Sequence, residues 1–67
     1  MIRIRLNGVE REVADALSVA ELLAANGYAQ RRVAVEINRE IVPKSRHDLH
    51  CVNDGDRVEI VHALGGG

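Results

Sequence analysis

The sequence is poor in aromatic residues: it has no Phe, no Trp and a single Tyr, Tyr28. A hydrophobic core must therefore be built from Val, Ile, Leu and Ala. Proteins that bind single strands of nucleic acid usually stack bases on aromatic rings, so this scarcity disfavours that function. The net charge of −1, from 9 Lys and Arg against 10 Asp and Glu, also provides no general attraction to nucleic acid or an anionic membrane.

Cysteine and long apolar runs are scarce as well. Cys51 is the only cysteine, which excludes an internal disulfide. The first apolar residues alternate with Arg3 and Arg5 instead of forming the continuous run of a signal peptide, so we expect a cytoplasmic protein without a membrane segment. No stretch matches the nucleotide-binding pattern G-x-x-x-x-G-K, and we expect no bound cofactor.

The length of 67 residues allows one domain. A chain this short buries only about 60% of the surface that its unfolded form exposes. A deep catalytic cleft is therefore not expected, and we predict that the protein is not itself an enzyme.

Residues 2–13 have the pattern of a β-hairpin. Apolar residues alternate with Arg3 and Arg5 up to Asn7-Gly8, a pair that tolerates the positive φ angles of a type I′ turn. A two-residue turn at this place puts Ile4 opposite Arg11, so one charged residue is expected on the apolar side, at the edge of the sheet.

A single amphipathic helix is predicted over residues 19–26. Ser18 and Glu21 have the S-x-x-E spacing of a capping box, in which each residue accepts a hydrogen bond from the backbone of the other. Gly27 stands where a left-handed residue commonly ends a helix.

The segment "VAVEINREIVP" predicts a strand over residues 33–37, a turn near 38–40 and a short strand at 41–42 that Pro43 ends. Residues 44–53 lack a clear period, and we expect a loop there. Leu49 and Val52 are the apolar residues expected to anchor it to the core.

Asp54-Gly55 predicts a turn into a last strand with Val58 and Ile60 on its inner face. The helix after the hairpin is a crossover, so the first and last strands are expected to lie side by side and parallel near the centre of the sheet. The fold class is therefore α+β: a mixed sheet of four to five strands with one main helix on one face.

The sequence continues past this strand as "VHALGGG". A glycine run has no side-chain bulk and could enter a channel too narrow for residues with a Cβ. Chemistry at a terminal carboxylate would require activation, for example as an acyl adenylate made by a separate enzyme with ATP. Glycines at a chain end can equally be a frayed terminus without function, so the residues alone leave both interpretations open.

The hairpin, the capped helix, "VAVEINREIVP", "NDGDRVEIVHAL" and Gly66-Gly67 together resemble the ubiquitin-like sulfur carrier proteins, most closely the ThiS-type carriers of thiamine biosynthesis. The resemblance extends over essentially the whole chain. It implies a β-grasp (ubiquitin-like) domain over residues 1–64 and a flexible glycine tail over 65–67.

The resemblance also implies a function centred on Gly67, with Gly65 and Gly66 presenting it. A ubiquitin-activating-like adenylyltransferase would use ATP to adenylate the Gly67 carboxylate. A persulfide donor, such as a cysteine desulfurase, would convert it to a thiocarboxylate, and thiazole synthase would take the sulfur. We expect partners to dock on Val61, Leu64 and the exposed sheet face near them.

Two alternatives share this fold. The small subunit of molybdopterin synthase has the same tail chemistry but usually carries a proline before its Gly-Gly, where this sequence has His62, Ala63 and Leu64. A ubiquitin-like module that only docks, without using its carboxylate, is the second alternative.

Cys51 with His50 could form a nucleophile pair, and His47, His50 and Cys51 are all zinc-ligand types. Neighbouring residues of an extended segment point to opposite sides, however, and no second ligand pair stands at the expected spacing. We therefore expect Cys51 to act as a small hydrophobic residue, the histidines to lie at the surface, and no metal to bind.

Overall fold

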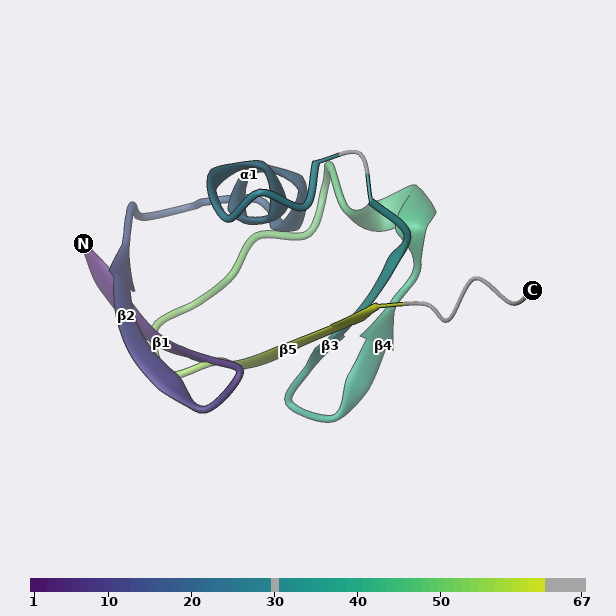
Figure 1. Cartoon of the computed structure of the whole chain (residues 1–67). Helices are drawn as coiled ribbons and strands as arrows, with labels where there is room; N and C mark the ends of the chain where they lie inside the picture. Colours follow the sequence, from purple (N-terminus) through teal and green to yellow (C-terminus); the bar gives the residue numbers. More distant parts are fainter. Residues whose placement is uncertain (30, 63–67) are drawn as a thin grey trace.

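The computed structural model describes residues 1–29 and 31–62 and has one helix packed on one face of a five-stranded sheet (Figure 1). The strand order is β2-β1-β5-β3-β4, with β5 parallel to β1 and antiparallel to β3. This confirms the predicted fold class and the pairing of the first and last strands. In chain order the elements are β1 (Ile2–Leu6), β2 (Val9–Val13), α1 (Val19–Ala25), β3 (Val33–Ile37), β4 (Glu40–Val42), the 3₁₀ turn η1 (Lys44–Arg46) and β5 (Arg57–His62).

The first hairpin has the predicted register. Ile4 lies opposite Arg11, and the turn residues Asn7 and Gly8 have φ angles of 49° and 84°. Both values fall in the left-handed region that a type I′ turn requires. Arg11 is exposed although it stands on the apolar side, because β2 is an edge strand.

The N-terminus of α1 carries the predicted capping box. The backbone N–H of Glu21 donates to Ser18 Oγ (3.0 Å), and the Ser18 N–H donates to Glu21 Oε1 (2.9 Å). Two N–H groups that the first turn would leave unpaired are thus satisfied.

The C-terminus of α1 is closed by Gly27, whose φ is 83°. The Tyr28 N–H donates to the Leu23 carbonyl (2.8 Å) and the Gly27 N–H to the Ala24 carbonyl (3.3 Å), which is the Schellman pattern. The helix ends at Ala25, one residue earlier than predicted.

A second two-residue turn joins β3 to β4. Asn38 and Arg39 have φ angles of 53° and 72°, so a turn of the I′ type is made without glycine. Asn tolerates this region because its short side chain can hydrogen-bond locally. Pro43 follows β4 directly, as predicted.

The segment from Lys44 to Asn53 differs from the expected loop in what anchors it. Val52 is buried, but Leu49 is 78% exposed, so its predicted anchoring role is wrong. His47 is buried instead, with Nε2 3.0 Å from the Val42 carbonyl oxygen, and the expectation that all the histidines lie at the surface is also wrong. This polar partner lets an imidazole replace an apolar anchor.

The core lies between α1 and the inner face of the sheet and contains only Val, Ile and Leu among its buried apolar residues. Tyr28 is partly buried against its margin. No helix within residues 1–29 and 31–62 is long and apolar enough to cross a bilayer. The buried apolar residues are Ile4, Leu6, Val19, Leu22, Leu23, Val35, Ile37, Val42, Val52, Val58 and Ile60.

The capping box predicts a pH-dependent contribution to stability. Hydrogen bonds from the Ser18 backbone N–H, and then from its side chain, lower the pKa of Glu21 below its ordinary value of 4.5. A lowered folded-state pKa gives stability that is present above pH 4.5 and lost as the pH falls through the lowered value. The wild type should therefore lose its advantage over Glu21→Gln between pH 6 and pH 3.

The measurement is the urea midpoint of both proteins, followed by circular dichroism across that pH range. Gln keeps a side-chain acceptor for the Ser18 N–H, so the comparison isolates the charge. Glu40→Gln, which removes an exposed carboxylate outside the helix, is the control. A difference between wild type and Glu21→Gln that stays constant with pH would contradict the interpretation.

Candidate functional site

The candidate site is the end of the central strand, where β5 leads into the glycine-rich segment. β5 pairs with β1 on one side and β3 on the other, and its last residue, His62, lies opposite Val33. β5 therefore lies between two strands (Figure 1), and its ladder with β3 reaches His62 while its ladder with β1 covers Arg57 and Val58. The predicted site residues Leu64, Gly65, Gly66 and Gly67 lie outside the described residues.

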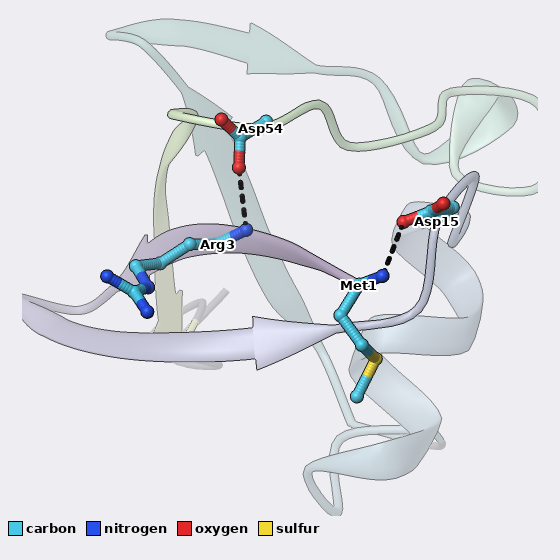
Figure 2. Close-up of polar contacts among 4 residues, drawn as sticks. All are labelled: Met1, Arg3, Asp15 and Asp54. Carbon is cyan, nitrogen blue, oxygen red and sulfur yellow. Dashed lines mark hydrogen bonds and ion pairs between the residues drawn. The ribbon is translucent and has the colours of Figure 1, made fainter.

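The turn before β5 fastens this strand to β1. The Arg3 N–H donates to Asp54 Oδ1 (2.8 Å), as Figure 2 shows, and the Gly55 N–H donates to the Arg3 carbonyl (2.7 Å). One residue pair along, the Arg5 N–H donates to the Asp56 carbonyl (2.9 Å). Gly55 adopts a φ of 87°, which side-chain-bearing residues rarely tolerate, so this turn depends on glycine.

Asp56 joins the same turn to the β3–β4 hairpin. Its side chain is buried, and both carboxylate oxygens accept hydrogen bonds: Oδ1 from Asn38 Nδ2 (3.0 Å) and Oδ2 from the Asn53 N–H (2.8 Å). Asn38 Oδ1 in turn accepts from the Arg57 N–H (3.0 Å). Asn38 and the turn "NDGD", two of the segments that carry the family resemblance, therefore determine where β5 begins.

The first hairpin holds β5 from the other side. The Asn7 N–H donates to the Val58 carbonyl (2.9 Å), and Asn7 Oδ1 accepts from the Ile60 N–H (2.8 Å). The turn residue thus extends the pairing of β1 and β5 by its side chain. The strand that precedes the predicted tail is consequently held along its whole length.

At its exit, β5 presents different groups on its two faces. The His62 ring lies against Tyr28, with 5.6 Å between the ring centroids and 55° between the planes. Val61 points to the opposite face, lies opposite Ala34 and is 54% exposed. Its exposure agrees with the predicted docking position, and the docking itself stays a prediction.

A groove of about 730 Å³ lies beside Tyr28, between α1 and η1. Arg31, Arg32 and Lys44 contribute cations to its lining, and Asp48 an anion. It lies on the helix side of the molecule, away from the face that carries Val61. Sequence reasoning did not find this groove, because its residues come from three separate segments.

The residues around Cys51 are not arranged as a catalytic or metal site. Cys51 is exposed, so its predicted role as a small hydrophobic residue is wrong. Its backbone instead pairs with Ser18 next to the helix. His47 is engaged by the Val42 carbonyl, and within residues 1–29 and 31–62 no three His, Cys, Asp or Glu side chains are grouped closely enough to hold a metal ion.

Comparison with known proteins identifies the family. The family model of the ThiS family matches residues 4–67. The chain belongs to the ThiS family. The predicted family and fold are thereby confirmed.

Individual relatives of this ThiS-family chain agree. It is 37% identical over 65 residues to the sulfur carrier protein ThiS of Bacillus subtilis (strain 168), covering 96% of this chain and 98% of that protein. A crystal structure of the thiamine biosynthesis protein ThiS from Geobacter metallireducens superposes with a TM-score of 0.85 at 39% identity, covering 98% and 100% of the two chains. Relatives that match this chain end to end are thus named as sulfur carrier proteins.

A longer relative carries the same region. The chain is 47% identical over 66 residues to a thiazole synthase of Paramagnetospirillum magneticum. The match covers 98% of this chain and 20% of that protein, so the chain spans about a fifth of the length of this relative.

The geometry around Asp56 predicts that replacing Asp56 costs more folding stability than replacing its neighbour Asp54. Asp56→Asn should cost about 1–3 kcal/mol, because an amide group would then face either the Asn38 NH₂ or the Asn53 N–H. Turning the Asn38 amide around would lose the bond from Arg57. Asp54 accepts one bond only, and Asp54→Asn can still accept it, so this control should cost less than about 1 kcal/mol.

Urea unfolding of the two variants, followed by circular dichroism, measures both changes. Equal costs for Asp54→Asn and Asp56→Asn would show that the buried carboxylate does not connect the hairpin to β5.

Proposed function

We propose that this domain carries sulfur for thiazole formation in thiamine biosynthesis, as a thiocarboxylate on Gly67. The end-to-end similarity to a protein named as sulfur carrier ThiS is the observation that carries the proposal. The family match extends through Gly67, and the last three positions of the sequence are glycines.

The chemistry follows from the poor reactivity of a carboxylate. An adenylyltransferase supplies ATP, the Gly67 carboxylate oxygen attacks its α-phosphorus, and pyrophosphate leaves. The terminal sulfur of a protein persulfide then attacks the acyl carbon, and AMP leaves. A second thiol attacks the resulting acyl disulfide, which leaves the thiocarboxylate on the carrier and a disulfide between the donor thiols.

The role of the carrier domain is to present the Gly67 carboxylate to its partner proteins. Its reacting group must enter the active sites of other proteins, and glycines give the narrowest peptide. A held β5 reduces the conformational freedom that docking would otherwise have to remove. No residue of the folded domain is needed as acid, base or nucleophile in this scheme.

Thiazole synthase is the proposed acceptor of the sulfur. A thiazole synthase contains a region 47% identical to this chain, so a domain of this kind occurs within such an enzyme. The adenylyltransferase and a persulfide donor, such as a cysteine desulfurase, complete the proposed partners, and we place the reactions in the cytoplasm.

The molybdopterin synthase small subunit is the alternative carrier. The approach to the glycines in this sequence, His62-Ala63-Leu64, has no proline, and the relatives named above belong to thiamine biosynthesis. Both observations favour the thiamine branch.

Intact-mass spectrometry tests the proposal directly. After incubation with the adenylyltransferase, ATP and a persulfide donor, the protein should gain the mass difference between one sulfur and one oxygen, and fragmentation should map the gain to Gly67. Omitting ATP is the control and should abolish the change. An unchanged mass with partners that modify another ThiS protein would refute the proposal.

Extending the chain by one alanine after Gly67 separates a carrier from a module that only docks. The extension moves the reacting carboxylate away from the position in which a partner would activate it, so adenylation should fall by at least about 100-fold. Pyrophosphate release measures this rate. A docking module would bind its partners unchanged and would show no pyrophosphate release in either form.

A further inference from the structure

The groove beside Tyr28 gathers positive charge. Arg31 and Arg32 stand between α1 and β3, Lys44 begins η1, and all three line the groove. Among the described residues the lining contains one carboxylate, that of Asp48. Three of the 9 Lys and Arg side chains of a chain with a net charge of −1 thus converge on one concave surface. A cleft lined by one sign of charge concentrates ions of the opposite sign, so its ligand should be an anion.

The number of charges favours a phosphate group over a single carboxylate. The lining has a formal excess of two positive charges, and a phosphate monoester carries a charge of about −1.5 to −2 at pH 7. A guanidinium can also donate two parallel hydrogen bonds to one phosphate, and an ammonium adds a compact charge. The ion pairs within residues 1–29 and 31–62 join Met1 to Asp15 and Arg3 to Glu12, so they do not involve these three cations.

The groove also has an apolar part. Leu23, Val33 and Tyr28 contribute to its lining; Leu23 is buried and the other two are half-buried. The volume of about 730 Å³ is far larger than a phosphate ion needs. It falls in the range of about 300–1,000 Å³ that is typical of small-molecule sites. The remaining space suits an apolar body, and a flat ring can pack against the ring of Tyr28.

Backbone hydrogen bonds hold the walls of the groove in place. The Ala20 N–H donates to the His47 carbonyl (2.8 Å), which joins α1 to the segment after η1. The Arg31 N–H donates to the Tyr28 carbonyl (3.1 Å) on the other side. The buried His47 lines the groove, and its Nε2 lies 3.0 Å from the Val42 carbonyl oxygen. A ligand would therefore meet walls that are already formed, which lowers the entropic cost of binding.

We propose that this groove binds a small organic phosphate monoester that carries a flat ring. Arg31, Arg32 and Lys44 hold the phosphate, and the ring packs against Tyr28 and Val33. The site is separate from the sulfur chemistry proposed for Gly67, and it stands whether or not that chemistry is correct.

The groove lies beside the end of β5. Val33 is opposite His62 in the sheet, and the Tyr28 and His62 rings are in contact. A ligand packed against Tyr28 is therefore close enough to change the surroundings of His62. The amide signals of Tyr28, Arg31 and His62 are the ones that should report its binding.

The test is a titration of the full chain, labelled with ¹⁵N, with phenyl phosphate at fixed ionic strength, followed by NMR. These amide signals should shift saturably, with a millimolar Kd or tighter. Inorganic phosphate should bind at least about 3-fold more weakly, because it buries no apolar surface. Phenol, which has the ring without the charge, should also bind more weakly than phenyl phosphate.

Substitutions of single charges locate the phosphate. Arg32→Gln and Lys44→Gln should each raise the Kd of phenyl phosphate by about 2- to 5-fold, as expected for exposed ion pairs, and the double variant should raise it further. Arg11→Gln is the matched control, because it makes the same charge change at an exposed position of β2, outside the groove. Its Kd should equal that of the wild type, since salt screens distant charges.

Tyr28→Leu tests the contact with the ring. It should reduce the preference for phenyl phosphate over inorganic phosphate while leaving the Kd of inorganic phosphate nearly unchanged. Both probes are measured on the same variant, so a general loss of stability would affect them equally and would not change their ratio.

Four outcomes would overturn the inference. The first is the absence of saturable shifts at Tyr28 and Arg31 up to about 20 mM phenyl phosphate. The second is an equal rise of Kd in Arg11→Gln, which would show a general attraction to anions. The third is inorganic phosphate binding as tightly as phenyl phosphate. The fourth is tighter binding of tetraglutamate than of phenyl phosphate, which would assign the groove to an acidic protein segment.

Discussion

The parallel pairing of β1 with β5 is the constraint on which the rest of the structure depends. Parallel neighbours cannot be joined by a tight turn, and the chain connects β1 to β5 through β2, α1, β3 and β4. The ladder itself is short, with Arg5 opposite Arg57 and Leu6 opposite Val58. Hydrogen bonds from the Asp54–Asp56 turn and from Asn7 extend it at both ends. These hydrogen bonds therefore determine the position and direction of β5 in the sheet.

Local patterns in the sequence determine much of this fold. The hairpin register, the capping box and the left-handed Gly27 were predictable because each depends on residues only a few positions apart. The anchoring of the segment after Pro43 was not. Leu49 is exposed and His47 buried because a backbone carbonyl of β4 is positioned to accept a polar ring, and no local pattern reports such a tertiary contact.

The candidate site likewise has features that the sequence predicts and features that only the structure reveals. Gly67 could be proposed from resemblance alone, because the proposed chemistry takes place at a backbone carboxylate and not in a pocket. The groove beside Tyr28 could not, because its lining comes from three separate segments of the chain. Asp56 was noticed in the sequence as part of a characteristic turn, and its two hydrogen bonds give that turn a physical explanation. The characteristic segments of the sequence thus contain scaffold residues as well as the proposed reacting residue, and the sequence alone does not separate the two.

The contact between Tyr28 and His62 has a practical consequence. The protein has no Trp and no other Tyr, so its near-ultraviolet fluorescence comes from this one phenol ring. That ring lies 5.6 Å from the last residue of β5, centroid to centroid. The molecule thus contains a native optical reporter beside the last residue of β5, and events there can be followed without attaching a dye.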